Sequence, residues 1–166
     1  MRQRFIQSIG WQRLRGRRIA KQHFHESNLQ RLAQQIAHSE QGHSGEIGVA
    51  IEAVSPVHEL NTRMRALEVF GRLGVWDTPY NTGVLLYIAL DKRQIELIAD
   101  RGISAPDSSW QQVCHSLQQA FQAQNYFPAV CAAVQQLEQI LRAHTPALVA
   151  AHEDANHLDN RPVVLS

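Results

Sequence analysis

The chain has 166 residues, of which 44% are hydrophobic and 19% charged, and 16 basic residues stand against 15 acidic ones. A chain of this length can bury a substantial core in one domain, and its composition excludes global disorder. Its two cysteines are too few for a disulfide scaffold and lack the spacing of a zinc module. The longest strongly apolar run, residues 84–90, is far below the roughly 20 residues that span a bilayer. We therefore expect a soluble, cytoplasmic, single-domain protein without a signal peptide.

Basic residues are concentrated in the first 21 positions, ahead of the first acid, Glu26. Wound as a helix, this segment places several apolar residues on one broad face: Phe5, Ile6, Ile9 and Ile19. We expect residues 1–22 to form a basic arm whose apolar face packs on its own domain. Two alternatives stay open, contact through residues 1–21 with an anionic membrane surface or membrane-associated protein, and contact with nucleic acid, which is the least favoured. The membrane alternative would place the protein at the periphery of the inner membrane.

A capping-box pattern at Ser27 and Gln30 predicts the start of a helix that ends near Gly42. Residues 46–54 then alternate between apolar and polar positions, which predicts a strand with its glutamates on the polar side.

Pro56 is typical of the first position of a helix, and Gly74 is typical of a helix end. Between them, apolar residues recur at helical spacing, and we expect this stripe to be buried: Val57, Leu60, Met64, Leu67 and Phe70.

Residues 83–90 form a short, almost uniformly apolar run, which is typical of a central strand covered on both faces. The polar residues 91–93 predict a turn, in which Asp91 has a structural role. Residues 94–100 alternate again, so the two runs predict a β-hairpin.

Two more helices are expected, one from a second capping box at Ser108 and Gln111 and one opened by Pro128 and ending at Thr145–Pro146. Residues 147–166 are expected to be a flexible tail in which residues 162–165 can dock as a short strand.

The order of these elements predicts an α/β fold. A strand–helix–strand unit prefers a right-handed parallel crossover, and the hairpin adds an antiparallel strand. The result is a small mixed β-sheet with helices on both faces.

If the first two strands are parallel, three loops converge at one end of the sheet: residues 40–46, 76–81 and 100–102. Their side chains include several hard oxygen donors, which suit Ca²⁺ or Mg²⁺. The expected metal ligands are Glu40, His43, Glu46, Asp77, Asn81 and Asp100. Arg101 beside them suits a phosphate. The alternative is that these are ordinary charged residues at strand ends, with Asp77 capping a turn and Arg101 pairing with an acid.

Several stretches resemble the TPM domain family, which is named for a thylakoid lumen phosphatase, a photosystem II repair protein and a nematode receptor modulator. The resemblance runs from about Trp11 to the end of the chain. The segments that carry it are residues 39–47, 65–70, 75–78, 83–87, 98–103 and 161–165. The last two segments are similar to a compact bacterial subgroup.

The resemblance implies an α/β/α sandwich, here over residues 23–146, and either acid phosphatase activity or divalent-cation binding. Many members carry a signal peptide and a membrane helix, which this sequence does not show. Gly102-Ile103-Ser104 replaces a more typical Gly-Leu-Glu, which removes an acid from the expected site.

Two functions are therefore expected as alternatives. The first is a regulatory or interaction module that binds Ca²⁺ or Mg²⁺ and contacts a membrane-associated partner, because the arm is basic and no nucleophile motif or phosphate loop occurs. The second is a weak metal-assisted phosphatase with Asp77, Asp100 and Arg101 as catalytic candidates, in which Arg101 orients the phosphate.

Overall fold

The computed structural model describes residues 2–59, 61–147 and 158–166, with side chains from Gly10 onward. Over these residues the elements are, in order, α1 (Arg2–His23), α2 (Glu26–Ser39), β1 (Glu46–Glu52), α3 (Thr62–Arg72), β2 (Gly83–Ala89), β3 (Gln94–Ala99), α4 (Asp107–Gln122), α5 (Tyr126–His144) and β4 (Val163–Leu165). The strand order is β3-β2-β1-β4, with β1 parallel to both β2 and β4 and the β2–β3 pair antiparallel. The predicted mixed sheet and hairpin are confirmed.

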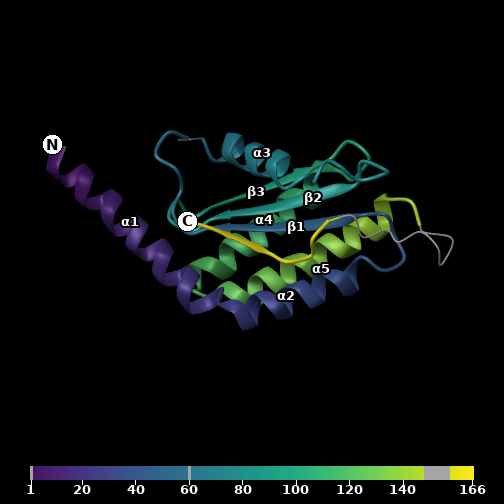
Figure 1. The fold of residues 1–166 in the computed structure, drawn as a ribbon, viewed down its shortest axis with the longest axis horizontal. Coiled ribbons are helices and arrows are strands. Elements are labelled where there is room, and N and C mark those ends of the chain that lie inside the picture. Colours follow the sequence, from purple (N-terminus) through teal and green to yellow (C-terminus); the bar gives the residue numbers. More distant parts are fainter. Residues whose placement is uncertain (1, 60, 148–157) are drawn as a thin grey trace.

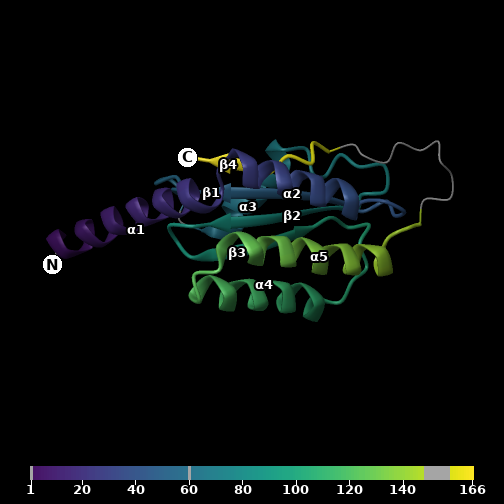
Figure 2. The same cartoon turned by 90° about the horizontal axis from the view of Figure 1, so that it is seen from below.

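Helices cover both faces of the sheet (Figure 1). Helix α3 lies on one face, and α2, α4 and α5 lie on the other, as the view from below also shows (Figure 2). The fully buried strand β2 supplies side chains to both layers: Val84, Leu86 and Ile88 join the larger core, and Leu85, Tyr87 and Ala89 join the core under α3. An uninterrupted apolar run is therefore needed here, because neither face of β2 meets water.

The predicted boundaries and buried face of the third helix are wrong. Helix α3 begins at Thr62, because the side chain of Asn61 accepts hydrogen bonds from the backbone N–H groups of Arg63 and Met64. Most of the stripe expected to be buried is exposed or half-buried, with Val57 at 73% exposure, and its member Leu60 lies outside the described residues. The face of α3 that meets the sheet instead carries Arg65, Ala66 and Val69.

The two predicted capping boxes are also wrong. Helix α2 begins at Glu26 after His25, and α4 begins at Asp107 after Pro106, in both cases without a side-chain cap. Helix α5 begins two residues before Pro128, which still lies in the first turn, where its missing N–H is tolerated. The helix itself was predicted correctly in each case, since its apolar spacing is set by the core it faces.

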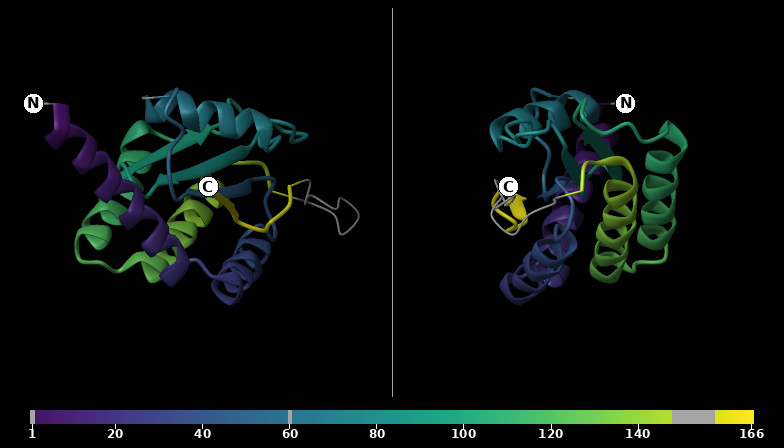
Figure 3. Two further views of the ribbon diagram at one scale, coloured as in Figure 1. Left: turned by 60° about the vertical axis from the view of Figure 1, so that its left-hand side comes forward. Right: turned by 90° about the vertical axis from the view of Figure 1, so that its right-hand side faces the viewer.

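Helix α1 packs on the domain only through its second half (Figure 3). Ile19 and Ala20, together with Phe24 just after the helix, are buried in the larger core. Towards the N-terminus the helix extends away from the rest of the molecule, and Trp11 and Leu14 are 76% and 62% exposed. The predicted apolar face at residues 5–9 lies outside the described side chains.

The end of the chain returns to the sheet. β4 pairs with β1 in parallel, Ala50 opposite Val163, which confirms the short strand predicted for residues 162–165. Most of the segment predicted as a flexible tail, residues 148–157, lies outside the described residues. Within the described part of the chain, no helix has the length and apolar character needed to cross a membrane.

Candidate functional site

The parallel direction of β1 and β2 brings three loops to one end of the sheet. Glu46, the first residue of β1, lies opposite Gly83, the first residue of β2. The backbone N–H of Asp100, just after β3, donates to the carbonyl oxygen of Gly83 at 2.9 Å. The strand ends that carry the predicted ligands are therefore neighbours, as the topology argument requires. Their side chains, however, lie in three different environments.

The first environment holds Glu40 and Glu46, both almost fully buried. Oε1 of Glu40 accepts a hydrogen bond from the backbone N–H of Ile47 at 2.7 Å, so the residue ties the end of α2 to β1. Oε2 of Glu46 accepts one from the backbone N–H of Leu158 at 2.7 Å, which ties β1 to the C-terminal segment. Two acids thus lie between α2, β1 and residues 158–160.

Glu40 has a strongly perturbed acidity. Burial, followed by the nearby charge of Glu46, raises its pKa to about 8, although its hydrogen bond from Ile47 and the Asn160 side chain act in the opposite direction. Oε2 of Glu40 and Oδ1 of Asn160 are both buried and accept no hydrogen bond from the described residues. At neutral pH the protonated form of this carboxyl group therefore predominates, and its Oε2 is a buried polar atom that is left for a ligand to satisfy.

The second environment holds His43, which is 1% exposed. Its Nδ1 accepts a hydrogen bond from the backbone N–H of Gly45 at 3.1 Å. The ionisable groups that influence it are Arg142 and Glu138 on α5, and burial is the main cause that lowers its pKa. His43 is therefore a buried, uncharged side chain, and Arg142 and Glu138 of α5 are the charged groups that influence it.

The third environment is the open rim formed by the loops beside β2 and β3. Asp77 is exposed, and Arg101 donates from Nη2 to Oδ1 of Asn81 at 3.3 Å. Oδ1 of Asp100 accepts the backbone N–H of Arg101 at 2.7 Å, whereas Oδ2 is buried without a hydrogen-bond partner among the described residues. Asn81 has a positive φ of 55°, and its carbonyl accepts the N–H of Gly102 at 2.8 Å, which locks the two loops together.

The predicted ligands share one end of the sheet but do not converge on one point. Within the ranges that the structure describes, no three His, Cys, Asp or Glu side chains form a group that could hold a metal ion. What the structure does bring together is the pair Glu40 and Glu46 with Asn160.

Sequence reasoning missed the part played by the C-terminal segment at this end. Asn160 and the N–H of Leu158 come from more than 100 residues away in the chain, beside Glu40 and Glu46. The expected docking of residues 162–165 on a strand was the one signal in the sequence that points there. Thr82 was missed as well, and its hydroxyl donates to the carbonyl of Ser44 at 2.5 Å, joining the first loop to β2.

Fold and site define a small α/β/α domain with two buried glutamates, Glu40 and Glu46, at one end of its sheet. The family model of the TPM domain matches residues 20–140, and the chain belongs to that family. The match begins in the last turn of α1 and ends near the end of α5. Most of α1 and the whole of β4 therefore lie outside it. Among curated proteins, none matches the chain.

Two solved structures share the fold. The NMR structure of the BA42 protein from the psychrophilic bacterium Bizionia argentinensis aligns with a TM-score of 0.72 and 24% identity, covering 83% of this chain and 92% of that one. The N-terminal domain of a protein from P. gingivalis aligns with a TM-score of 0.61 and 18% identity, covering 75% and 82%. At these identities the likeness concerns the fold.

Proposed function

We propose that this TPM-domain protein is a regulatory or interaction module that binds a divalent cation at Glu40 and Glu46. The observation that carries the proposal is the Glu40 carboxyl group, which is buried beside a second acid and has an oxygen without a hydrogen-bond partner among the described residues. A cation between the two acids would replace the proton that Glu40 otherwise holds.

The donors at this place fit a hard cation. Ca²⁺ and Mg²⁺ prefer carboxylate and amide oxygens and complete their coordination with water. Glu40 just after α2, Glu46 at the start of β1 and Asn160 of the C-terminal segment offer such oxygens. Because Glu46 also accepts the N–H of Leu158, a cation here would couple its binding to the docking of residues 158–165 on β1.

The test is a calorimetric titration of the full chain with Ca²⁺ and Mg²⁺ at pH 7, repeated in buffers that differ in ionisation enthalpy. We expect binding accompanied by release of about one proton, because Glu40 must lose its proton to become a ligand. Glu40→Gln and Glu46→Gln should each abolish this binding. Glu138→Gln, which alters an acid on α5 paired with Arg142, is the matched control.

Two further variants separate the buried pair from the open rim. Asp77→Asn and Asp100→Asn should leave cation affinity unchanged if the ligands are Glu40 and Glu46. Loss of affinity in these rim variants alone, or the absence of any heat or proton release at millimolar cation, would contradict the proposal.

The projecting half of α1 supports the second part of the proposal, contact with an anionic membrane surface or with a protein bound there. Trp11 and Leu14 are exposed apolar side chains, and Arg17 and Arg18 are exposed cations on the same helix. An amphipathic helix with this composition is attracted to anionic headgroups and inserts its apolar side chains at the interface.

Co-sedimentation with vesicles of phosphatidylglycerol and phosphatidylcholine tests this contact. The full chain should pellet with anionic vesicles and much less with neutral ones, and removal of residues 1–14 should abolish pelleting. Trp11→Ala should weaken it, whereas Trp76→Ala on the distant loop should not. Equal pelleting of the full and shortened chains would refute the membrane contact. Failure of the full chain to pellet with either kind of vesicle would also refute direct membrane binding.

The alternative function, a weak metal-assisted phosphatase, is favoured by one observation at the rim. The buried Oδ2 of Asp100 has no hydrogen-bond partner among the described residues, and Arg101 follows it directly. Hydrolysis of p-nitrophenyl phosphate with Mg²⁺ should then be lost in Asp100→Asn and reduced in Arg101→Gln. Activity that both variants retain would exclude this site as its source.

A further inference from the structure

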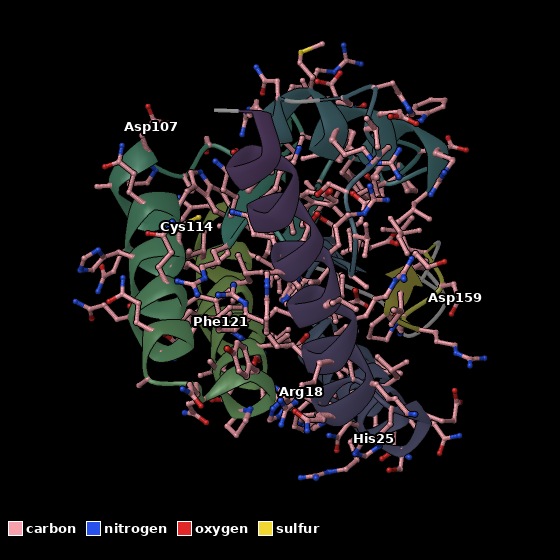
Figure 4. The ribbon with its side chains drawn as sticks, turned by 90° about the vertical axis from the view of Figure 1, so that its left-hand side faces the viewer. Arg18, His25, Asp107, Cys114, Phe121 and Asp159 are labelled. Carbon is pink, nitrogen blue, oxygen red and sulfur yellow. The ribbon has the colours of Figure 1, made fainter. Side chains whose placement is uncertain are left out.

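We propose that a cleft at the opposite end of the sheet binds a small organic anion that carries a heteroaromatic ring. The cleft has a volume of about 460 Å³, and it lies between α1, the β2–β3 hairpin and the turn between α4 and α5. Figure 4 looks onto this end of the molecule, where α1 passes beside the α4–α5 turn, near Phe121. The volume is within the range of roughly 300–1,000 Å³ typical of ligand sites.

The charged side chains that line the cleft are all cationic. Arg15 comes from α1 and Arg93 from the hairpin turn, and Asp and Glu are absent from the described lining. Asp91 of the same turn is engaged elsewhere, because its two carboxylate oxygens accept from the N–H and hydroxyl of Ser55. An anion that enters therefore meets two guanidinium groups without a competing carboxylate.

Arg15 has hydrogen-bonding capacity to spare. Its Nη2 donates to the carbonyl of Leu90 at a long 3.4 Å, and its buried Nε has no hydrogen-bond partner among the described residues. A guanidinium carries five N–H donors in a planar fork that suits phosphate or carboxylate oxygens. A buried donor without an acceptor costs free energy that a bound anion would recover.

The position of Arg15 depends on its neighbour Gly16. A Cβ built on Gly16 would lie 2.0 Å from the carbonyl oxygen of Ala53, so the backbone of α1 touches the chain just after β1. This close crossing holds α1 as one wall of the cleft. Because Arg15 precedes the residues matched by the family model, this wall lies outside the TPM match.

The remaining lining suits a planar ring with polar edges. Phe121 and Tyr126 form an edge-to-face pair with ring centroids 5.0 Å apart, which offers an aromatic surface. Amide side chains come from α4 and the α4–α5 turn, on Gln118, Gln122 and Gln124, whereas the side-chain oxygen of Gln94 already accepts the hydroxyl of Thr62. An amide both donates and accepts hydrogen bonds, as the edge of a heteroaromatic base requires.

The experiment is an amide-shift titration of the isotopically labelled full chain at constant ionic strength. The probes are adenosine monophosphate, nicotinate, adenosine and inorganic phosphate. We expect adenosine monophosphate or nicotinate to shift the amides of residues 93–95 and 121–126. The probe that binds more tightly shows whether the anionic group of the ligand is a phosphate or a carboxylate. Adenosine and inorganic phosphate should each bind at least about tenfold more weakly, since each lacks one half of the contacts.

Arg15→Gln and Arg93→Asn should each weaken binding about tenfold, through the loss of charged hydrogen bonds. Asparagine is chosen at position 93 because it tolerates the positive φ of 56° found there. Arg18→Gln, an exposed arginine on the same helix, is the control and should have no effect. Equal weakening by Arg18→Gln, equal affinity for adenosine monophosphate and inorganic phosphate, or no shifts at millimolar probe would each overturn the proposal.

Discussion

Arg65 on α3 and Glu52 at the end of β1 form an ion pair in the protein core, with Nη2 of Arg65 2.6 Å from Oε1 of Glu52. The hydroxyl of Tyr87 donates to the other carboxylate oxygen, and Arg65 also contacts Glu68 at 2.8 Å. The hydrogen bonds to Glu52 are the main cause that raises the pKa of Arg65. This network sets the face that α3 turns to the sheet.

Replacing Arg65 should destabilise the fold strongly. Arg65→Leu leaves the carboxylate of Glu52, which is 2% exposed, without its cation, and we expect a loss of about 3–5 kcal/mol in the free energy of unfolding. The double variant with Glu52→Leu should recover much of this loss. Urea unfolding followed by circular dichroism measures both.

Arg63→Leu is the control for that series. Its ion pair with Glu96 is 3.6 Å long and partly exposed, and Arg63 also donates to the carbonyl of Leu97 at 2.8 Å, so the expected loss is about 1 kcal/mol. Similar losses in Arg65→Leu and Arg63→Leu would show that burial of the pair does not matter.

Two glycines of α1 should respond oppositely to substitution by alanine. Gly10→Ala meets nothing within 4 Å and should stabilise the helical form of the projecting half of α1 by roughly 0.5–1 kcal/mol, seen as higher helicity in circular dichroism. Gly16→Ala collides with the carbonyl of Ala53 and should detach α1, exposing Ile19. Hydrogen exchange of residues 15–24 measures the detachment, and protection that is unchanged in Gly16→Ala would disprove the close crossing.

The stability of the folded protein should fall as pH rises from about 4.5 to about 8, because of Glu40. Over this interval the folded state holds a proton on Glu40 that the unfolded chain has released, so the folded state binds more protons. The full contribution is present below pH 4.5, and it is on the order of 3–5 kcal/mol over the whole interval.

Glu40→Gln provides the comparison for this pH series, because it removes the titrating group and keeps a neutral amide of similar shape. The lowered pKa of His43 acts in the opposite direction, since stability is lost as the pH falls below 6.5. This effect of His43 is the same in the unsubstituted protein and in Glu40→Gln, so it cancels in the comparison. Equal slopes of unfolding free energy against pH in the two proteins would show that Glu40 is not protonated.

The contribution of the Asn61 side-chain cap of α3 to the free energy of unfolding should be measurable by itself. Asn61→Ala removes the acceptor for the N–H groups of Arg63 and Met64 and should cost about 1 kcal/mol. The same change at His25, which precedes α2 without a side-chain cap, should cost less, and thermal unfolding of the two variants compares them.

The parts of the fold that follow from local pattern were predictable. The hairpin and the central strand β2 depend on residues close in sequence, and the structure confirms both, whereas the structural role predicted for Asp91 combines a local bond from the N–H of Lys92 with long-range bonds from Ser55. The face of α3 was not predictable, because an arginine that pairs with a glutamate in the core looks, in sequence, like a solvent-facing residue. The cleft between α1 and the hairpin gave no local signal either, since its walls come from segments about 75 residues apart.

At the candidate site, the predicted strand direction placed the correct loops at one end of the sheet. Which of their side chains lie together could not be predicted from local sequence patterns. The burial of Glu40 beside Glu46 and Asn160 depends on the docking of the C-terminal segment, which is more than 100 residues away in the chain.

The sequence by itself determined the order of the elements, the membership of the TPM family and the end of the sheet where acidic residues gather. These depend on hydrophobic periodicity, turn residues and motifs, which are all properties of neighbouring residues. Only the tertiary structure decided that Glu40 lies with Glu46 and Asn160, that His43 is buried, and that Arg15 and Arg93 line one cleft. The physical reason is that burial and charge proximity arise from packing between distant segments, and these set both the pKa of a side chain and the partners it can bind.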